Sequence, residues 1–269
     1  MTYETVAHEV EIATGGAAPM TAYVARPAGT GRHPAVLVGA ELWGLTEDVR
    51  GIVRQVAALG YVAIAPNLYH RSGPETATGL AENAANRERA FELLGQLTRD
   101  GVEEDLRAAV AHVRTHAQAT EQTGVLGFSL GGHIAYFAAT RLDLAAAAIF
   151  YPGWLPVAGT ALSRPEPLLA TTGSLAERDV RVLMFFAELD HVIDAEQRTQ
   201  IAEALTAAGA RHEEVVYPGA RHAFFFPGRE PYDKAAAEDS WARVRATCSP
   251  PNSAGRAPGS RPAGLGRIR

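Results

Sequence analysis

Short apolar segments alternate with segments of helical spacing along most of the chain. The apolar segments are typical of strands, and most of them suit strands that are buried on both faces of a sheet. The segments of helical spacing repeat their apolar positions every three or four residues. The predicted strands are 5–14, 20–26, 35–39, 61–65, 124–127, 145–151, 182–187 and 213–217, and the predicted helices are 46–59, 81–97, 102–117, 130–140, 195–208 and 231–245. This alternation predicts an α/β fold, with a mostly parallel sheet flanked by helices on both faces.

The same pattern predicts a single domain over residues 1–246, because no linker separates two apolar cores. Residues 247–269 differ in composition. They are rich in Pro, Gly, Ser and Arg, contain no acidic residue and carry few apolar side chains. Such a segment cannot bury enough surface to offset its ordering entropy, so we expect it to be disordered.

Composition and charge narrow the classes of function. The net charge of −5 is modest and its signs are mixed along the chain, which gives no basic face for nucleic acid. The single cysteine, Cys248, cannot form an internal disulfide, and no signal peptide or membrane-spanning apolar run is visible. We therefore expect a cytoplasmic protein with no membrane or nucleic-acid partner, present as a monomer or a small homo-oligomer.

The segment Gly127-Phe128-Ser129-Leu130-Gly131 matches the motif G-x-S-x-G. A predicted strand leads into it and a predicted helix follows it, which is the setting that exposes a nucleophilic serine on a sharp turn. The alternative is a glycine-rich turn in which the serine caps the helix. The strand, the helix and both glycines together favour Ser129 as a nucleophile.

A serine nucleophile needs a base, and the base needs an acid that orients it. Asp190 follows the apolar strand 182–187 at its C-terminal end, where functional groups of such sheets gather. Glu188 and Asp194 are its rivals, and Asp194 also suits the N-cap of the next helix. His222 follows the last predicted strand and is the candidate base, although His133, one turn after Ser129, could also touch the site.

These residues resemble the dienelactone hydrolase family of the α/β-hydrolase fold over about residues 20–245. The resemblance rests on four segments, Glu41-Leu42-Trp43-Gly44, Gly127-Phe128-Ser129-Leu130-Gly131-Gly132, Leu189-Asp190 and Gly219-Ala220-Arg221-His222-Ala223-Phe224. The first, second and fourth segments, in this order, are more specific than the serine motif alone. The nucleophile of the type enzyme is a cysteine, and Ser129 stands at its place, as serine does in many relatives.

The resemblance also implies the surroundings of the nucleophile. The backbone N–H groups of Leu42 and Leu130 would form the oxyanion hole. Glu41 matches a glutamate that controls the thiol in the cysteine enzyme. Because a serine does not titrate near neutral pH, Glu41 would here orient Ser129, contact substrate or be only a loop carboxylate. Trp43, beside these residues, is a further candidate for substrate contact.

Two arginines hold the substrate carboxylate in the type enzyme. Arg87 falls near the first, and its alternative role is that of a solvated helix charge. Phe226 stands at the place of the second, a departure that weakens the case for a carboxylated lactone. Phe224 and Phe226 suggest an apolar wall for the substrate, although some of these aromatic residues could serve in core packing.

The sequence thus predicts a serine hydrolase in which Ser129, His222 and Asp190 cleave a small carboxylic ester or lactone. The mechanism needs no metal and no organic cofactor. One alternative keeps the three residues but acts on a peptide or another acyl compound. The other is a non-catalytic binding protein on the same scaffold, because fold alone does not determine function.

Overall fold

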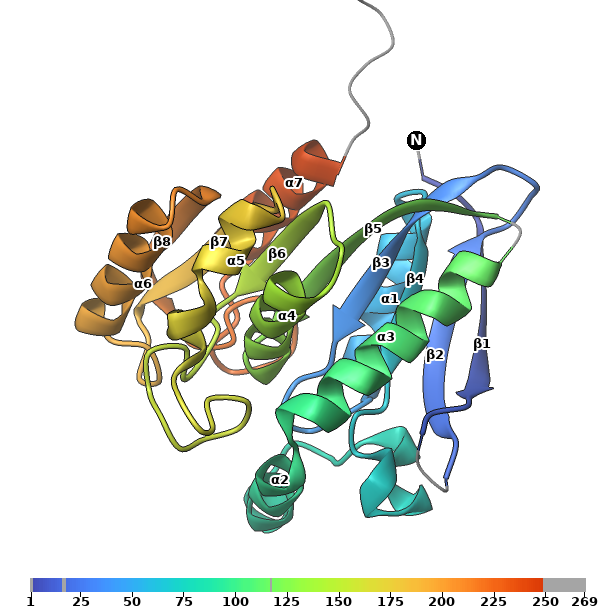
Figure 1. Ribbon diagram of the computed structural model, residues 1–269, viewed down its shortest axis with the longest axis horizontal. Coiled ribbons are helices and arrows are strands. Elements are labelled where there is room, and N and C mark those ends of the chain that lie inside the picture. Colours follow the sequence, from blue (N-terminus) through green and yellow to red (C-terminus); the bar gives the residue numbers. More distant parts are fainter. Residues whose placement is uncertain (1, 16–17, 117, 249–269) are drawn as a thin grey trace, which may run out of the picture.

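Eight strands form one sheet in the part of the chain that the computed structural model describes, residues 2–15, 18–116 and 118–248 (Figure 1). Their order across the sheet is β1-β2-β4-β3-β5-β6-β7-β8. The strands are β1 (Thr5–Ile12), β2 (Met20–Pro27), β3 (His33–Gly39), β4 (Val62–Pro66), β5 (Ala119–Phe128), β6 (Ala146–Phe150), β7 (Arg181–Leu189) and β8 (Arg211–Arg221).

Only β2 runs opposite to the other strands of the sheet. β1 pairs with β2 and β2 pairs with β4 in antiparallel fashion, whereas the strands from β4 to β8 all run parallel. The inner parallel strands are apolar and mostly buried, as expected for a sheet covered on both faces, whereas the edge strand β8 is largely exposed. Their C-terminal ends therefore meet at one edge of the sheet.

Helices cover both faces of this sheet (Figure 1). α3 and α4 pack against β3, β4, β5 and β6, and α1 packs on the opposite face, where it shares an apolar cavity over β5 and β6 with α7. The helices are α1 (Glu47–Ala58), α2 (Ala84–Gln96), α3 (Arg99–Thr115), α4 (Leu130–Arg141), α5 (Gly173–Glu177), α6 (Ala195–Ala207) and α7 (Lys234–Cys248). The α/β prediction is confirmed.

Differences from the sequence prediction lie mainly between the elements. The segment 67–78, predicted as a loop, contains the 3₁₀ helices η1 (His70–Ser72) and η2 (Pro74–Thr78), and η3 (Leu168–Thr171) precedes the unpredicted α5. These turns are too short to produce helical periodicity in the sequence. α7 begins at Lys234 rather than at residue 231, and Asp233 accepts a hydrogen bond from the Ala236 amide at its start.

The tail lies mostly beyond the described residues. Residues 247 and 248 belong to α7, and residues 249–269, for which disorder is predicted, fall outside the described part. The single-domain assignment of residues 1–246 stays a prediction. In the described part of the chain, no helix is both long enough and apolar enough to cross a lipid bilayer.

Candidate active site

Ser129 lies between the end of β5 and the start of α4 in a conformation that few non-glycine residues adopt. Its φ is 53° and its ψ is −117°. The Ser129 amide donates to the Phe150 carbonyl of β6 (N···O 3.0 Å), which anchors the turn to the neighbouring strand. Strained backbone of this kind persists where the surrounding structure enforces it, and it is found at functional sites.

The glycines around Ser129 allow backbone segments to approach closely. A Cβ added at Gly127 would lie 1.9 Å from the Gly131 carbonyl oxygen, and one at Gly131 would lie 2.2 Å from the Gly39 carbonyl oxygen. Both distances are far inside van der Waals contact, so only glycine fits at these positions. The motif therefore packs the start of α4 directly against the ends of β3 and β5.

The structure brings Ser129, His222 and Asp190 into one hydrogen-bonded chain. The distance from Ser129 Oγ to His222 Nε2 is 2.9 Å, and His222 Nδ1 lies 2.8 Å from Asp190 Oδ2 and 3.0 Å from Oδ1. Because a carboxylate only accepts hydrogen bonds, Nδ1 carries the hydrogen and Nε2 is left to accept from the serine hydroxyl. This geometry is that of a nucleophile, its base and the acid that orients the base.

Asp190 is itself fixed, and its two rivals have other partners. The Asp190 side chain is fully buried, and Oδ1 accepts from the amides of Val192 and Ile193 at 2.8 and 3.1 Å. Glu188 accepts from the Gly219 amide, and Asp194 caps α6 by accepting from the Gln197 amide. Only Asp190 among the three carboxylates contacts His222 in the described structure.

His133, the other histidine considered near the serine, points away from it. It is fully buried in α4, and its Nδ1 pairs with the Gly153 carbonyl at 2.8 Å. Burial lowers the pKa of His133 to about 4, so the ring is neutral at ordinary pH. The His133 ring therefore supports the segment around Gly153, and only its backbone amide contacts Ser129, by donating to the Ser129 carbonyl at 3.0 Å.

A pocket of about 220 Å³ opens at Ser129 and His222. Leu42 and Trp43, from the segment after β3, form part of its wall. Arg87 and Phe91 line it from α2, and Trp154 and His191 line it from the loops after β6 and β7. The predicted residues Arg87, Trp43 and Glu41 thus all lie at this pocket, so the Ser129 hydroxyl faces a wall of both apolar and charged side chains.

Glu41 is buried at the pocket and is paired with an arginine that the sequence analysis did not single out. Arg229 donates to both of its carboxylate oxygens, from Nη2 to Oε2 at 2.8 Å and from Nη1 to Oε1 at 3.2 Å. Arg229 also contacts Asp48 and Glu82 at 2.6 and 3.2 Å. Burial raises the pKa of Glu41, and the charge and hydrogen bonds of Arg229 oppose this effect.

The profile of the dienelactone hydrolase family matches residues 20–249, which is most of the chain. The chain belongs to the dienelactone hydrolase family. The match includes every residue of the site described above, so family membership and site geometry concern the same part of the molecule.

In the described residues, no group of three or more His, Cys, Asp or Glu side chains could hold a metal ion.

Individual members of the dienelactone hydrolase family are similar over most of their length. A "Putative carboxymethylenebutenolidase" of Synechocystis sp. is 34% identical over 83% of this chain and 88% of its own length. A "Probable 2-oxo-3-(5-oxofuran-2-ylidene)propanoate lactonase" of Bradyrhizobium sp. is 30% identical over 90% of this chain and 93% of its own. The crystal structure of a "Putative Dienelactone Hydrolase" from Klebsiella pneumoniae is 30% identical, with a TM-score of 0.80, and covers 90% and 98% of the two chains.

The predicted apolar wall of Phe224 and Phe226 needs correction. Both side chains are buried and neither lines the pocket. Phe224 packs between the rings of Tyr151 and Tyr217, and Phe226 packs against Phe128. The aromatic residues that follow His222 belong to the core, where Phe225 packs against Phe128 at the end of β5 and Phe150 at the end of β6.

Arg229 supplies a cation beside Phe226 that the sequence pattern did not predict. Its guanidinium lies 4.2 Å from the centre of the Phe226 ring and reaches the pocket. The position expected to carry an arginine thus holds a phenylalanine, and an arginine three residues later supplies the cation from above the ring. Nothing local in the sequence marks Arg229, because its carboxylate partners come from distant segments.

Proposed function

We propose that this protein hydrolyses a small carboxylic ester or lactone, with Ser129 as the nucleophile, His222 as the general base and Asp190 as the acid that orients it. The observation that carries the proposal is the hydrogen-bonded chain from Ser129 Oγ through His222 to the buried Asp190 carboxylate, which opens on the pocket. Membership of the dienelactone hydrolase family and the names of the similar proteins support it.

In the first half of the reaction, Ser129 Oγ attacks the carbonyl carbon while His222 Nε2 accepts the hydroxyl proton. Asp190 stabilises the imidazolium that results. The developing oxyanion accepts hydrogen bonds from the amides of Leu42, in the segment after β3, and of Leu130, directly after the serine. His222 then returns the proton to the leaving oxygen, the carbon–oxygen bond breaks, and an acyl group remains on Ser129.

In the second half, water takes the place of the leaving alcohol. His222 removes a proton from the water, the hydroxide attacks the acyl carbon, and Ser129 leaves with the proton that His222 gives back. For a lactone, the leaving oxygen stays attached to the acyl group, so a single hydroxy acid is released. The net reaction adds one water molecule to the ester or lactone bond.

The charges at the pocket favour at most one substrate carboxylate. Among the described residues no acidic side chain pairs with Arg87, so its guanidinium is free to bind an anion. Arg229, by contrast, is already surrounded by Glu41, Asp48 and Glu82. We assign Arg87 as the residue that would hold a substrate carboxylate, and Trp43 and Trp154 as contacts for the apolar part.

The test is a panel of short esters, unsaturated lactones and acyl peptides, measured with the wild type and with Ser129→Ala. We expect turnover of an ester or lactone that falls by on the order of 10⁴- to 10⁶-fold in the variant, as for other removed serine nucleophiles. Near wild-type turnover in Ser129→Ala would remove the proposal. Turnover of acyl peptides alone would favour the alternative function, in which the same three residues act on a peptide or another acyl compound.

A further inference from the structure

The segment that follows β3 carries the Leu42 amide, and each of its carbonyls is held. The Glu41 carbonyl accepts from the Gly44 amide at 2.9 Å, and the Trp43 carbonyl accepts from the Leu80 amide at 2.7 Å. The Leu42 carbonyl between them accepts from the hydroxyl of Tyr69 at 3.0 Å. Tyr69 supplies the only one of these three bonds that comes from a side chain.

These bonds determine where the Leu42 N–H points. A trans peptide is planar, so the N–H of Leu42 points opposite to the Glu41 carbonyl, which Gly44 holds. The peptide on the other side of Leu42 is held through its carbonyl by Tyr69. With both flanking peptides fixed, neither backbone dihedral of Leu42 can change without breaking a hydrogen bond.

The ring of Tyr69 also packs against this segment. Gly44 has a φ of 78°, and a Cβ added there would lie 3.3 Å from Tyr69 Cδ2. Tyr69 is buried, and burial raises the pKa of its hydroxyl above the usual range. The hydroxyl therefore remains protonated at any working pH, and it can donate to the Leu42 carbonyl throughout.

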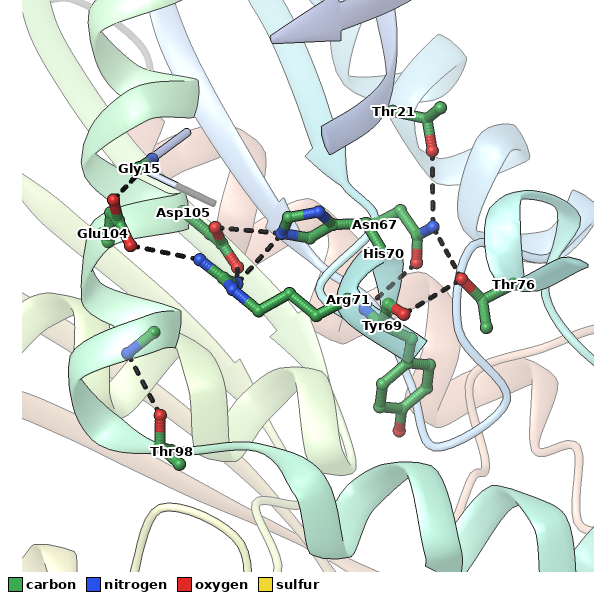
Figure 2. A network of polar contacts seen from close by, with 11 residues as sticks. Gly15, Thr21, Asn67, Tyr69, His70, Arg71, Thr76, Thr98, Glu104 and Asp105 are labelled. Carbon is green, nitrogen blue, oxygen red and sulfur yellow. Dashed lines mark hydrogen bonds and ion pairs between the residues drawn. The ribbon is translucent and has the colours of Figure 1, made fainter. Parts of the chain in front are cut away.

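Tyr69 is held in turn by the polar network that Figure 2 shows. Its amide donates to Asn67 Oδ1 at 3.1 Å, and its carbonyl accepts from Thr76 Oγ1 at 3.1 Å. Asn67 Nδ2 donates to the Thr76 hydroxyl at 3.1 Å and to Thr21 of β2 at 3.3 Å. The Tyr69 amide is thus fixed by the Asn67 side chain, and its carbonyl also accepts from the Ser72 amide at 2.9 Å.

The next two residues anchor the same segment to α3 (Figure 2). The buried Asp105 carboxylate contacts His70 at 3.2 Å and pairs with Arg71, whose guanidinium also reaches Glu104 at 3.1 Å. His70 and Asp105 are buried, whereas Arg71 and Glu104 are partly exposed. A side-chain network of this kind rigidifies the backbone it holds.

We propose, on the basis of the proposed function, that Tyr69 is a positioning residue that holds the Leu42 amide in its oxyanion-binding orientation. Tyr69 touches neither substrate nor the reacting atoms. It acts through the Leu42 carbonyl, and the network at Asn67, Thr76 and Asp105 keeps its ring and hydroxyl in place. Its contribution belongs to the transition state, because the oxyanion forms only there.

The test compares Tyr69→Phe with the wild type on the ester or lactone that the substrate panel identifies. The variant removes one hydroxyl and keeps the ring against Gly44. We expect kcat and kcat/KM to fall together by about tenfold, a part of the 10²- to 10³-fold that complete loss of an oxyanion donor costs. We expect inhibition by an alkyl boronic acid, which forms a tetrahedral anionic adduct on the serine, to weaken by a similar factor.

Tyr136→Phe is the matched control. Tyr136 is also a fully buried tyrosine whose hydroxyl has one hydrogen-bond partner, Thr172, and it does not line the pocket. Both variants should lose some thermal stability, but only Tyr69→Phe should lose kcat and boronate affinity. Equal kinetics in the two variants would overturn the role of Tyr69, whereas a wild type without hydrolase activity would overturn the proposed function and this inference with it.

Discussion

At the scale of single residues, Arg229 is the most unusual charge of the site. Its guanidinium contacts three carboxylates, and the Glu41 carboxylate among them is buried with almost no exposed surface. A buried ion pair gives little net stability, but removal of one partner leaves the other charge without compensation. The role of Arg229 can therefore be measured through what its loss does to Glu41.

We predict that Arg229→Gln lowers the free energy of unfolding by about 3–5 kcal/mol at pH 7, and by less at pH 5. Without the arginine, burial and the charge of Glu82 raise the pKa of Glu41 further above the ordinary value, and only the weaker effect of His222 opposes them. Urea unfolding of the wild type and the variant from pH 5 to 8 measures the difference. Arg221→Gln is the control, because Arg221 and its partner Glu230 are both exposed.

The sign of this pH dependence follows from linkage. A carboxyl group whose pKa is raised by folding favours the folded state in its protonated form, so this stabilisation is present below the unfolded pKa near 4.5 and is lost as the pH rises through the folded pKa. The destabilisation by Arg229→Gln should therefore grow from pH 5 towards pH 7. An equal loss at both pH values would contradict the assignment of Arg229 as the partner of a buried carboxylate.

At the scale of elements, α2 provides one wall of the pocket. Asn83 caps it by accepting a hydrogen bond from the Asn86 amide. Arg87 and Phe91 are four residues apart, so they share the face of the helix that meets the pocket. Phe91 is 44% exposed although it is aromatic, which is consistent with a position at the rim of the pocket.

We predict that Arg87→Ala raises KM for a substrate with a carboxylate by about tenfold or more, because the variant loses one charge-assisted hydrogen bond to that carboxylate. A neutral analogue of the same shape should be affected far less. Arg89→Ala is the control on the same helix, because Arg89 pairs with Glu75 and Glu92 instead of lining the pocket. If Arg87→Ala raises KM equally for both substrates, Arg87 does not bind the substrate carboxylate.

The periodicity of apolar positions predicted most of the regular elements. It carries no information about contacts between distant segments. Strands such as β6 and helices such as α4 carry their own signal, because burial on a sheet face imposes a pattern of apolar positions. The segment 67–78 carries none, yet it holds Tyr69 against Leu42 through Asn67 and Thr76. The function of such a segment follows from its tertiary contacts and not from its own composition.

At the scale of the whole molecule, parallel strands gather the site at one edge of the sheet. Ser129 follows β5, Asp190 follows β7 and His222 follows β8, so residues up to 93 positions apart become neighbours. The G-x-S-x-G motif, the chain order and the positions after strands were enough to predict that these three residues lie together. The pairing of Arg229 with Glu41 spans 188 positions and the burial of Phe226 depends on packing, so neither could be predicted from local patterns. The cellular compartment and the oligomeric state stay predictions.

The most direct measurement of the central claim is covalent labelling of the full chain with a fluorophosphonate, followed by mass spectrometry of the intact protein and its peptides. The account predicts one adduct per chain, on the peptide that contains Ser129. It also predicts no adduct in Ser129→Ala, and slow labelling in His222→Ala because the serine then lacks its base. A wild type that hydrolyses esters without being labelled, or an adduct of equal yield in Ser129→Ala, would contradict it.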